Sequence, residues 1–279
     1  MKKKHTIENA VCQIKQKIEK AIRDNGVKGK NALIRSQDPI CILHDAAKAS
    51  FIEKGVDPSQ IFPAFGMHKG EKKLAGFLKN KDQDICLLPK GVSPRPETLN
   101  FPGMLKGTED PYGFEFTQRT LSVNVRSQLS SMAKNFDTLY ERTFAEALNL
   151  HLRCEKMVLG ELYMIPVYEY DSDSAKRKKV AFKDNANVSE FIQKYIYSFD
   201  AVNNRSVSKG EEYKYERVCL LIVDFSKSIP KIYNTDDELK EDGLLPEDSK
   251  ASINEMKYTT FTDTLLKVYS SRFGKSRFK

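Results

Sequence analysis

The spacing of apolar residues predicts helices at the start of the chain. In residues 6–24, Ile and Val side chains recur every three or four positions, which is the spacing of an amphipathic helix, and Gly26 follows as a stop signal. The same spacing predicts a second helix over 39–54. We therefore expect a helical N-terminal region over 1–70 and a larger domain over 71–279.

The larger domain alternates between strand-like and helix-like patterns. Short apolar runs predict strands at 83–89, 114–127, 157–170 and 217–225, and the spacing of three and four predicts helices at 131–153, 187–200 and 261–272. The segment 89–113 is rich in proline and glycine and reads as a long loop. This order is typical of an α/β fold with a mixed central sheet flanked by helices.

The charge and composition of the chain indicate which class of partner it binds. Lys and Arg outnumber Asp and Glu by 46 to 38, a net charge of +8, which favours a polyanion such as nucleic acid. The chain has five cysteines, an odd number, and no pair has the spacing of zinc ligands. We therefore expect free thiols in a reducing compartment. Residues 1–5 are basic without the apolar core of a signal peptide, and no run approaches the ~18 apolar residues of a membrane span. We expect a cytoplasmic protein with no membrane partner.

Polar side chains with metal-binding chemistry gather on two of the predicted strands. Asp84 opens the first strand, and Asp82 would share its face. Asn124 and Arg126 share a face of the second strand. Phosphodiester hydrolysis with Mg²⁺ needs acidic oxygens, because hard cations prefer oxygen ligands. Asp84 is the first candidate ligand, although both aspartates also suit a solvated strand end.

The predicted helix over 131–153 offers a second acid. Its apolar stripe runs through Phe144, Ala145, Leu148 and Leu152. Extended backwards by three or four residues, this stripe reaches Glu141, which we expect to face the sheet. Glu146 falls on the expected solvated side with Arg142. Glu141 is therefore the first choice for the second ligand, with Glu115 and Glu146 next, although a surface ion pair would also explain Glu141.

These residues resemble the signature of the PD-(D/E)XK nucleases, which include type II restriction endonucleases. The family pattern is an Asp followed by a strand that carries (D/E)-x-Lys. Here Asn124-Val125-Arg126 stands in place of that tripeptide and departs from it at both functional positions. A second alignment through Glu115-Phe116-Thr117 keeps the acid and loses the lysine.

The resemblance covers about residues 76–170 and implies a restriction-endonuclease-like fold. Several enzymes of this fold, notably those that cut CCGG-centred sites, take a metal-binding Glu from the helix after the second strand. The resemblance places that role at Glu141 or Glu146. The candidates for the catalytic lysine are Lys134, Lys81 and Lys79. Arg126 is a weaker candidate for this role because it cannot lose its proton.

The polar segment after the second strand suits phosphate contacts and base-edge hydrogen bonds. The candidates for DNA binding are Lys81, Arg126, Ser127, Gln128, Ser130, Ser131, Lys134 and Arg142. Ser130 or Ser131 would also cap the following helix.

Three functional hypotheses follow. The first is a Mg²⁺-dependent type II restriction endonuclease that cuts double-stranded DNA at a specific short site as a homodimer. Its catalytic candidates are Asp84, Asn124, Arg126, Lys134 and Glu141, and its metal-ligand candidates are Asp84, Glu115, Glu141 and Glu146. The second, favoured by the missing (D/E)-x-Lys, is a nuclease-like protein that binds DNA without cutting it. The third is a basic regulatory or scaffold protein with a protein partner.

Overall fold

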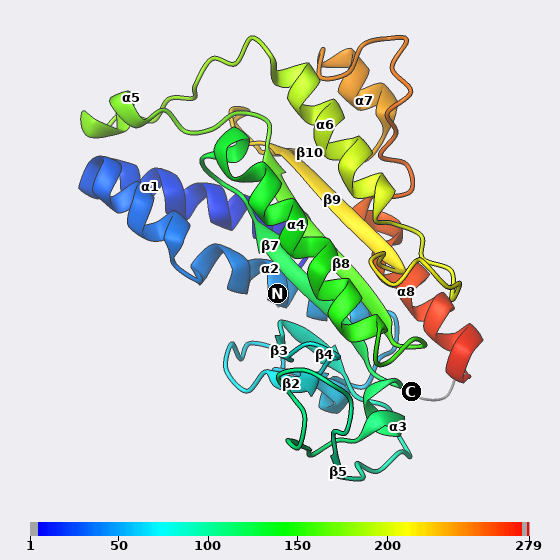
Figure 1. Ribbon diagram of the computed structural model, residues 1–279. Coiled ribbons are helices and arrows are strands. Elements are labelled where there is room, and N and C mark those ends of the chain that lie inside the picture. Colours follow the sequence, from blue (N-terminus) through cyan, green and yellow to red (C-terminus); the bar gives the residue numbers. More distant parts are fainter. Residues whose placement is uncertain (1–4, 275–277, 279) are drawn as a thin grey trace.

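A mixed sheet between two layers of helices forms the body of the molecule (Figure 1). The computed structural model describes residues 5–274 and residue 278. Residues 1–4, which belong to the segment without signal-peptide character, lie outside the described residues. Within the described part of the chain, no helix has the length and apolar character that crossing a membrane requires.

The helices and strands have the following bounds. The helices are α1 (Ile7–Arg35), α2 (Asp38–Glu53), α3 (Phe114–Thr117), α4 (Met132–His151), α5 (Ser172–Lys176), α6 (Val188–Ala201), α7 (Asp236–Glu241) and α8 (Tyr258–Phe273), with a 3-10 helix at Pro58–Gln60. The large sheet has the strand order β1 (Ile61–Phe62), β4 (Ile85–Leu87), β7 (Leu121–Ser127), β8 (Val158–Pro166), β9 (Arg217–Asp224) and β10 (Lys231–Tyr233). Two hairpins stand apart, β2 (Lys72–Ala75) with β3 (Asn80–Gln83), and β5 (Glu97–Thr98) with β6 (Glu109–Asp110).

The centre of the sheet is parallel and its two sides are antiparallel. Strands β7, β8 and β9 run parallel, whereas β4 pairs antiparallel with both β1 and β7, and β10 pairs antiparallel with β9. Parallel neighbours need a crossover, and α4 and α6 lie in the two crossovers. The predicted α/β class with a mixed sheet and helical N-terminal part is confirmed.

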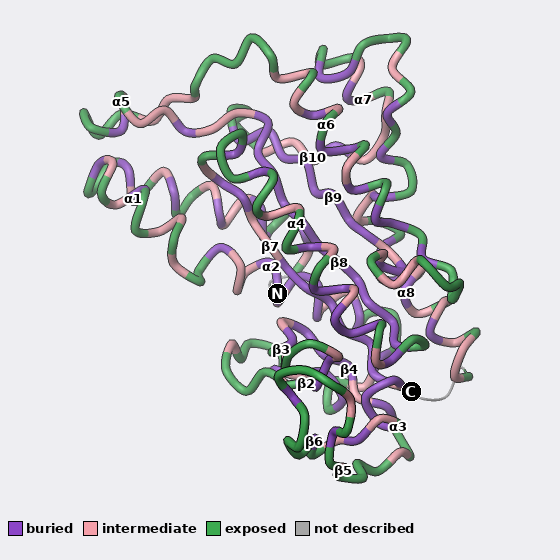
Figure 2. The backbone as a smooth tube through the Cα atoms, in the orientation of Figure 1, coloured by how far each residue is buried: buried purple, intermediate pink, exposed green. Residues whose placement is uncertain are grey.

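Each face of the sheet has its own apolar core, because successive strand residues point to opposite faces. On one face, α1, α2 and α8 pack against residues such as Val123 and Leu162. On the other, α4, α6 and α7 pack against residues such as Leu159 and Tyr163. Figure 2 shows the central strands as mostly buried. The N-terminal helices therefore share a core with the sheet, and β1 of the same region belongs to the sheet itself.

Local structure departs from the sequence-based expectations at three places. Gly26 interrupts α1 with φ +60°, but helix continues to Arg35. Phe114–Thr117 was expected as strand and is instead helical, because the Thr117 N–H bonds to the carbonyl of Gly113 at 3.0 Å. The chain also bends at Asp84, so that only Ile85–Leu87 of the predicted strand joins the large sheet.

The shared core predicts that a substitution in α1 destabilises the whole fold. Ile18 is fully buried, so Ile18→Ala should lower the free energy of unfolding by about 2–5 kcal/mol. Ile229 is 75% exposed, so Ile229→Ala should change it by less than about 0.5 kcal/mol. Chemical denaturation followed by circular dichroism measures both. An early, separate unfolding of the first helices, with the main transition unchanged, would contradict the shared core.

Candidate functional site

The buried face of α4 carries a row of polar side chains, which we call the polar stripe: Thr143, Glu146, Asn149 and Arg153, the last just beyond the helix. Their spacing of three and four places them on one face. The Glu146 side chain is only 6% exposed, whereas Glu141 is exposed. The expectation that Glu141 faces the sheet and Glu146 faces solvent was therefore wrong. Ala145 and Leu152, assigned to the apolar stripe, are exposed.

Glu146 is surrounded by donors from two strands, β3 and β7, and from its own helix. Lys81 of β3 places its Nζ 3.1 Å from Glu146 Oε2, and Arg126 of β7 bonds the same oxygen through Nη2. Asn124 donates to it at 3.4 Å. Arg142, one turn earlier on α4, lies 3.5 Å from Oε1 and is 66% exposed. A carboxylate can remain buried here because cations compensate its lost hydration.

Arg126 bridges two buried carboxylates. Its Nη1 donates to Glu161 Oε1 of β8 at 2.8 Å and to Thr143 Oγ1 at 2.7 Å, while Nη2 bonds Glu146. Burial raises the pKa of the fully buried Glu161 to about 7, although Arg126 opposes this shift. Burial alone would lower the pKa of Arg126, but Glu161 and Glu146 hold it above its ordinary value. Arg126 therefore remains a fixed cation.

Asp84 lies at the bend between β3 and β4, next to this cluster. Its Oδ2 accepts a hydrogen bond of 2.8 Å from the Val125 N–H of β7. Burial raises the pKa of the Asp84 carboxyl, and the Val125 N–H and Lys81 oppose the rise. Asp82 was expected on the same face, but it is exposed and pairs with Lys73 at 3.8 Å. The bend separates the two aspartates, so Asp84 alone reaches the cluster.

Asp84 and Glu146 line one pocket of about 300 Å³, which we call the Asp84–Glu146 pocket. Its lining residues are Ile40, Lys81, Asp84, Val125, Arg126, Ser127, Leu139, Arg142, Glu146 and Tyr163. Among the described residues, no group of three or more His, Cys, Asp or Glu forms a metal-holding cluster. Two carboxylates still suit Mg²⁺, which is usually held by one or two carboxylates together with water and substrate phosphates.

The remaining predicted metal and lysine candidates lie apart from this pocket. Glu115 sits on α3, 62% exposed, and pairs with Arg119 at 2.9 Å. Lys134 is exposed in the first turn of α4. Neither side chain lines the Asp84–Glu146 pocket, and Glu141 does not line it either. Of the lysines considered, Lys81 is the one that contacts the pocket acids.

The polar segment after β7 makes hydrogen bonds within the protein. The Gln128 carbonyl accepts from the hydroxyls of Tyr163 at 2.7 Å and Tyr195 at 2.6 Å, and its amide donates to the Met132 carbonyl at 3.0 Å. Its expected role in reading bases is therefore not supported. Ser131 is exposed and Ser130 partly exposed.

The expected serine cap of the helix is also absent. Ser131 precedes α4 with φ +55° and makes no side-chain cap bond. The Glu169 carboxylate takes that place and accepts from the backbone N–H of Ser131 at 3.1 Å and of Met132 at 2.9 Å. A carboxylate suits the positive end of the helix dipole, so the cap comes from a distant segment.

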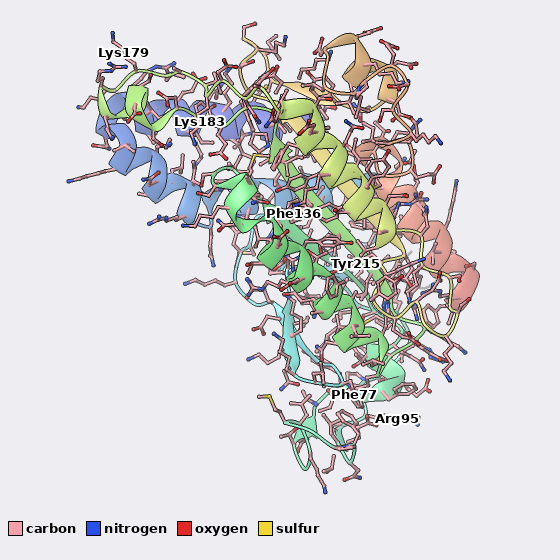
Figure 3. All side chains as sticks on the ribbon, turned by 45° about the horizontal axis from the view of Figure 1, so that its top comes forward. Phe77, Arg95, Phe136, Lys179, Lys183 and Tyr215 are labelled. Carbon is pink, nitrogen blue, oxygen red and sulfur yellow. The ribbon has the colours of Figure 1, made fainter. Side chains whose placement is uncertain are left out.

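Two residues of the cluster carried no recognised signal in the sequence. Glu161 is a single acid inside the apolar run of β8. Tyr215 precedes β9, donates to the Thr143 carbonyl at 2.7 Å and accepts from Asn124 at 3.2 Å. Figure 3 shows Tyr215 beside α4. A lone acid in an otherwise apolar strand is the one local sign that could have indicated Glu161, because such a charge needs a buried partner.

The raised pKa of Glu161 predicts a pH-dependent stability. The folded chain binds this proton more tightly than the unfolded chain, where the value is near 4.5. The resulting stabilisation is complete below about pH 4.5 and is lost as the pH rises through about 7. Relative to Glu161→Gln, wild type should lose about 1–3 kcal/mol of unfolding free energy between about pH 5 and pH 8.

Denaturant titrations across this pH range test the prediction. The exposed Glu141→Gln is the matched control, and its difference from wild type should not vary with pH in the same way. Parallel stability curves for wild type and Glu161→Gln would contradict the raised pKa.

Comparisons of this chain with family models, curated proteins and solved structures find no match. Asp84, Glu146, Lys81 and Arg126 all line one pocket, and Arg126 also pairs with Glu161 of β8.

Proposed function

We propose that this protein is a Mg²⁺-dependent endonuclease that hydrolyses phosphodiester bonds in double-stranded DNA. The observation that carries this proposal is the shared pocket of Asp84 and Glu146, two carboxylates from separate elements with Lys81 and Arg126 beside them. The net charge of +8 supports a polyanionic substrate. Paired acids with adjacent cations are what metal-assisted phosphodiester cleavage requires.

Each charged residue of the pocket has a role in this proposal. Asp84 and Glu146 would hold Mg²⁺, which when bound polarises the phosphate and lowers the pKa of an attacking water. Lys81 would exchange its contact with Glu146 for the scissile phosphate or the attacking water. Arg126, always protonated, would stabilise charge developing on the phosphate. Arg142, whose side chain is 66% exposed, would contact a neighbouring phosphate.

The proposal extends to a restriction-type nuclease because of the resemblance to the PD-(D/E)XK signature. In this arrangement Glu146 of the helix after β7 supplies the second acid, and Lys81 takes the role of the lysine absent from β7. A palindromic site would require a homodimer, since two-fold protein symmetry matches two-fold DNA symmetry.

A second candidate function is DNA binding without cleavage. The observation that favours it is the saturation of Glu146, whose oxygens contact Lys81, Arg126, Asn124 and Arg142. A carboxylate compensated by protein cations has less need of a metal ion. In that case Lys81 would stay on Glu146, and the cations at the pocket would serve only to bind phosphate.

Matched substitutions test the nuclease. Asp84→Asn and Glu146→Gln should each lower Mg²⁺-dependent cleavage of mixed-sequence plasmid DNA by about 100-fold or more, because each removes a charge that serves the transition state. Asp82→Asn and Glu141→Gln should retain cleavage, because both side chains are exposed and lie outside the pocket. Gel assays of plasmid cleavage provide the rates.

The outcomes separate the candidates. DNA binding by Glu146→Gln in Ca²⁺, measured by fluorescence anisotropy, should survive the loss of cleavage. Wild-type protein that binds DNA but leaves it intact with Mg²⁺ and Mn²⁺ would support the second candidate. Loss of cleavage in Glu141→Gln with full activity in Glu146→Gln would refute the assignment of the second ligand.

A further inference from the structure

A second hollow lies between the end of α4 and the lobe formed by residues 72–113, which contains the two hairpins. It measures about 450 Å³, and we call it the aromatic pocket. Its lining residues are Phe77, Glu97, Thr98, Leu99, Asn100, Phe101, Phe114, Leu152 and Arg153. Figure 3 shows Phe77 and Arg95 in this lobe, at the end of the molecule opposite Lys179 and Lys183. The endonuclease mechanism makes no use of this pocket.

The polar stripe of α4 connects this lobe to the Asp84–Glu146 pocket. Asn149 accepts from the N–H groups of Leu78 at 2.7 Å and Lys79 at 3.0 Å, and donates to the Lys79 carbonyl at 3.0 Å. A Cβ at Gly76 would lie 2.3 Å from the Asn149 amide nitrogen, so the turn packs directly on this side chain. The turn leads into β3, which carries Lys81.

Arg153 fastens the lobe at a second point. It donates to the Ala75 carbonyl at 2.7 Å, to Glu97 at 2.7 Å and to Asp110 at 2.6 Å. It therefore holds both hairpins to the end of α4. From Glu146 to Arg153 the chain advances seven residues, about 10 Å along a helix. That distance corresponds to about three nucleotides of a B-form strand at ~3.4 Å each.

The walls of the aromatic pocket suit a flat heterocycle. Phe77 and Phe101 stack with ring centroids 5.2 Å apart and an interplanar angle of 20°, and both are only partly buried. Leu152 is 46% exposed at the rim. Thr98 and Asn100 are exposed and offer hydroxyl and amide groups to the edge of a ring. Aromatic side chains accept any nucleobase, because every base has a π-face.

The charge around the pocket is complementary to a nucleic-acid backbone. Lys79, Arg95 and Lys106 are exposed, and no ion pair within the described part of the chain involves them. Glu97 of the pocket wall and the neighbouring Asp110 both pair with Arg153, which offsets one of their two negative charges. A phosphate backbone that follows the lobe would therefore meet uncompensated positive charge.

We propose that the aromatic pocket binds an unstacked nucleobase of the DNA strand whose phosphate lies in the Asp84–Glu146 pocket. The inference rests on the proposed endonuclease function and adds a subsite about three nucleotides from the cleaved bond. A base must leave the duplex to offer its face to Phe77 or Phe101, so the subsite would favour flexible or mismatched steps.

Photocrosslinking tests this subsite directly. The probes are mixed-sequence single-stranded and duplex oligonucleotides with 5-iodouracil in place of thymine, bound to the full chain in Ca²⁺. Irradiation joins iodouracil to an aromatic ring stacked on it, and the modified peptide is then sequenced. The result expected is attachment at Phe77 or Phe101. Bound DNA whose crosslinks map only outside residues 72–114 would overturn the subsite and leave the endonuclease proposal standing. No DNA binding by wild type would overturn both.

A matched pair of substitutions tests the subsite by affinity and distinguishes loss of the aromatic ring from loss of folding. Phe101→Leu preserves apolar volume but removes the ring, and should weaken binding of single-stranded DNA by about fivefold or more. Phe65→Leu alters a ring that is 37% exposed and meets His5 edge-to-face, outside the lobe, and should leave binding unchanged. Circular dichroism confirms that both variants fold. Equal affinities for Phe101→Leu and wild type would overturn the subsite.

Discussion

The pairing of Arg126 with the buried carboxylates of Glu146 and Glu161 is the interaction on which the rest of the site depends. It joins β7 to α4 through Glu146 and to β8 through Glu161. Removing one member of a buried ion cluster leaves an uncompensated charge, which costs about 3–5 kcal/mol. The cluster therefore fixes the rotation of α4 about its own axis. With that rotation set, Glu146 faces the bend at Asp84 and Glu141 faces outward.

The same helix links the Asp84–Glu146 pocket to the lobe. One face of α4 presents Thr143 and Glu146 to the charge cluster, and further along Asn149 and Arg153 to the two hairpins. Because one rigid element carries both sets of contacts, Lys81 and Asp84 approach Glu146 in a defined geometry. Figure 1 shows α4 passing from the end of β7 down to the lobe. A substrate chain that engaged both places would be held along this helix.

Periodicity predicted the elements but not the burial of individual polar side chains. The segment 6–24 buries apolar residues at helical spacing, and 217–225 is a short continuous apolar run, so the helix and the strand were correctly expected. Phe114–Thr117 looks like strand because of its aromatic residues, but a turn begun at Gly113 determines its conformation. Local sequence contains no information about such a hydrogen bond.

Periodicity also failed to predict which of Glu141 and Glu146 is buried at the site. Both lie on one helix, and the apolar stripe assigned from the sequence turned Glu141 inward and Glu146 outward, the reverse of the observed arrangement. Partners distant in the sequence decided the outcome, namely Lys81, Arg126 and, through Arg126, Glu161. Asp84 was identified from the sequence because an acid at the start of a buried strand is itself a local pattern. Asp82 and Asp84 do not share a face because the chain bends between β3 and β4. The alternation of side chains along a regular strand does not predict such a bend.

Anomalous diffraction from crystals of the protein soaked in Mn²⁺ tests most directly whether Asp84 and Glu146 hold a metal ion. We expect a metal peak between Asp84 and Glu146, with carboxylate oxygens at about 2.0–2.3 Å, and with Lys81 moved away from Glu146. A map with no metal at this pocket, in which Lys81 still contacts Glu146, would contradict this expectation.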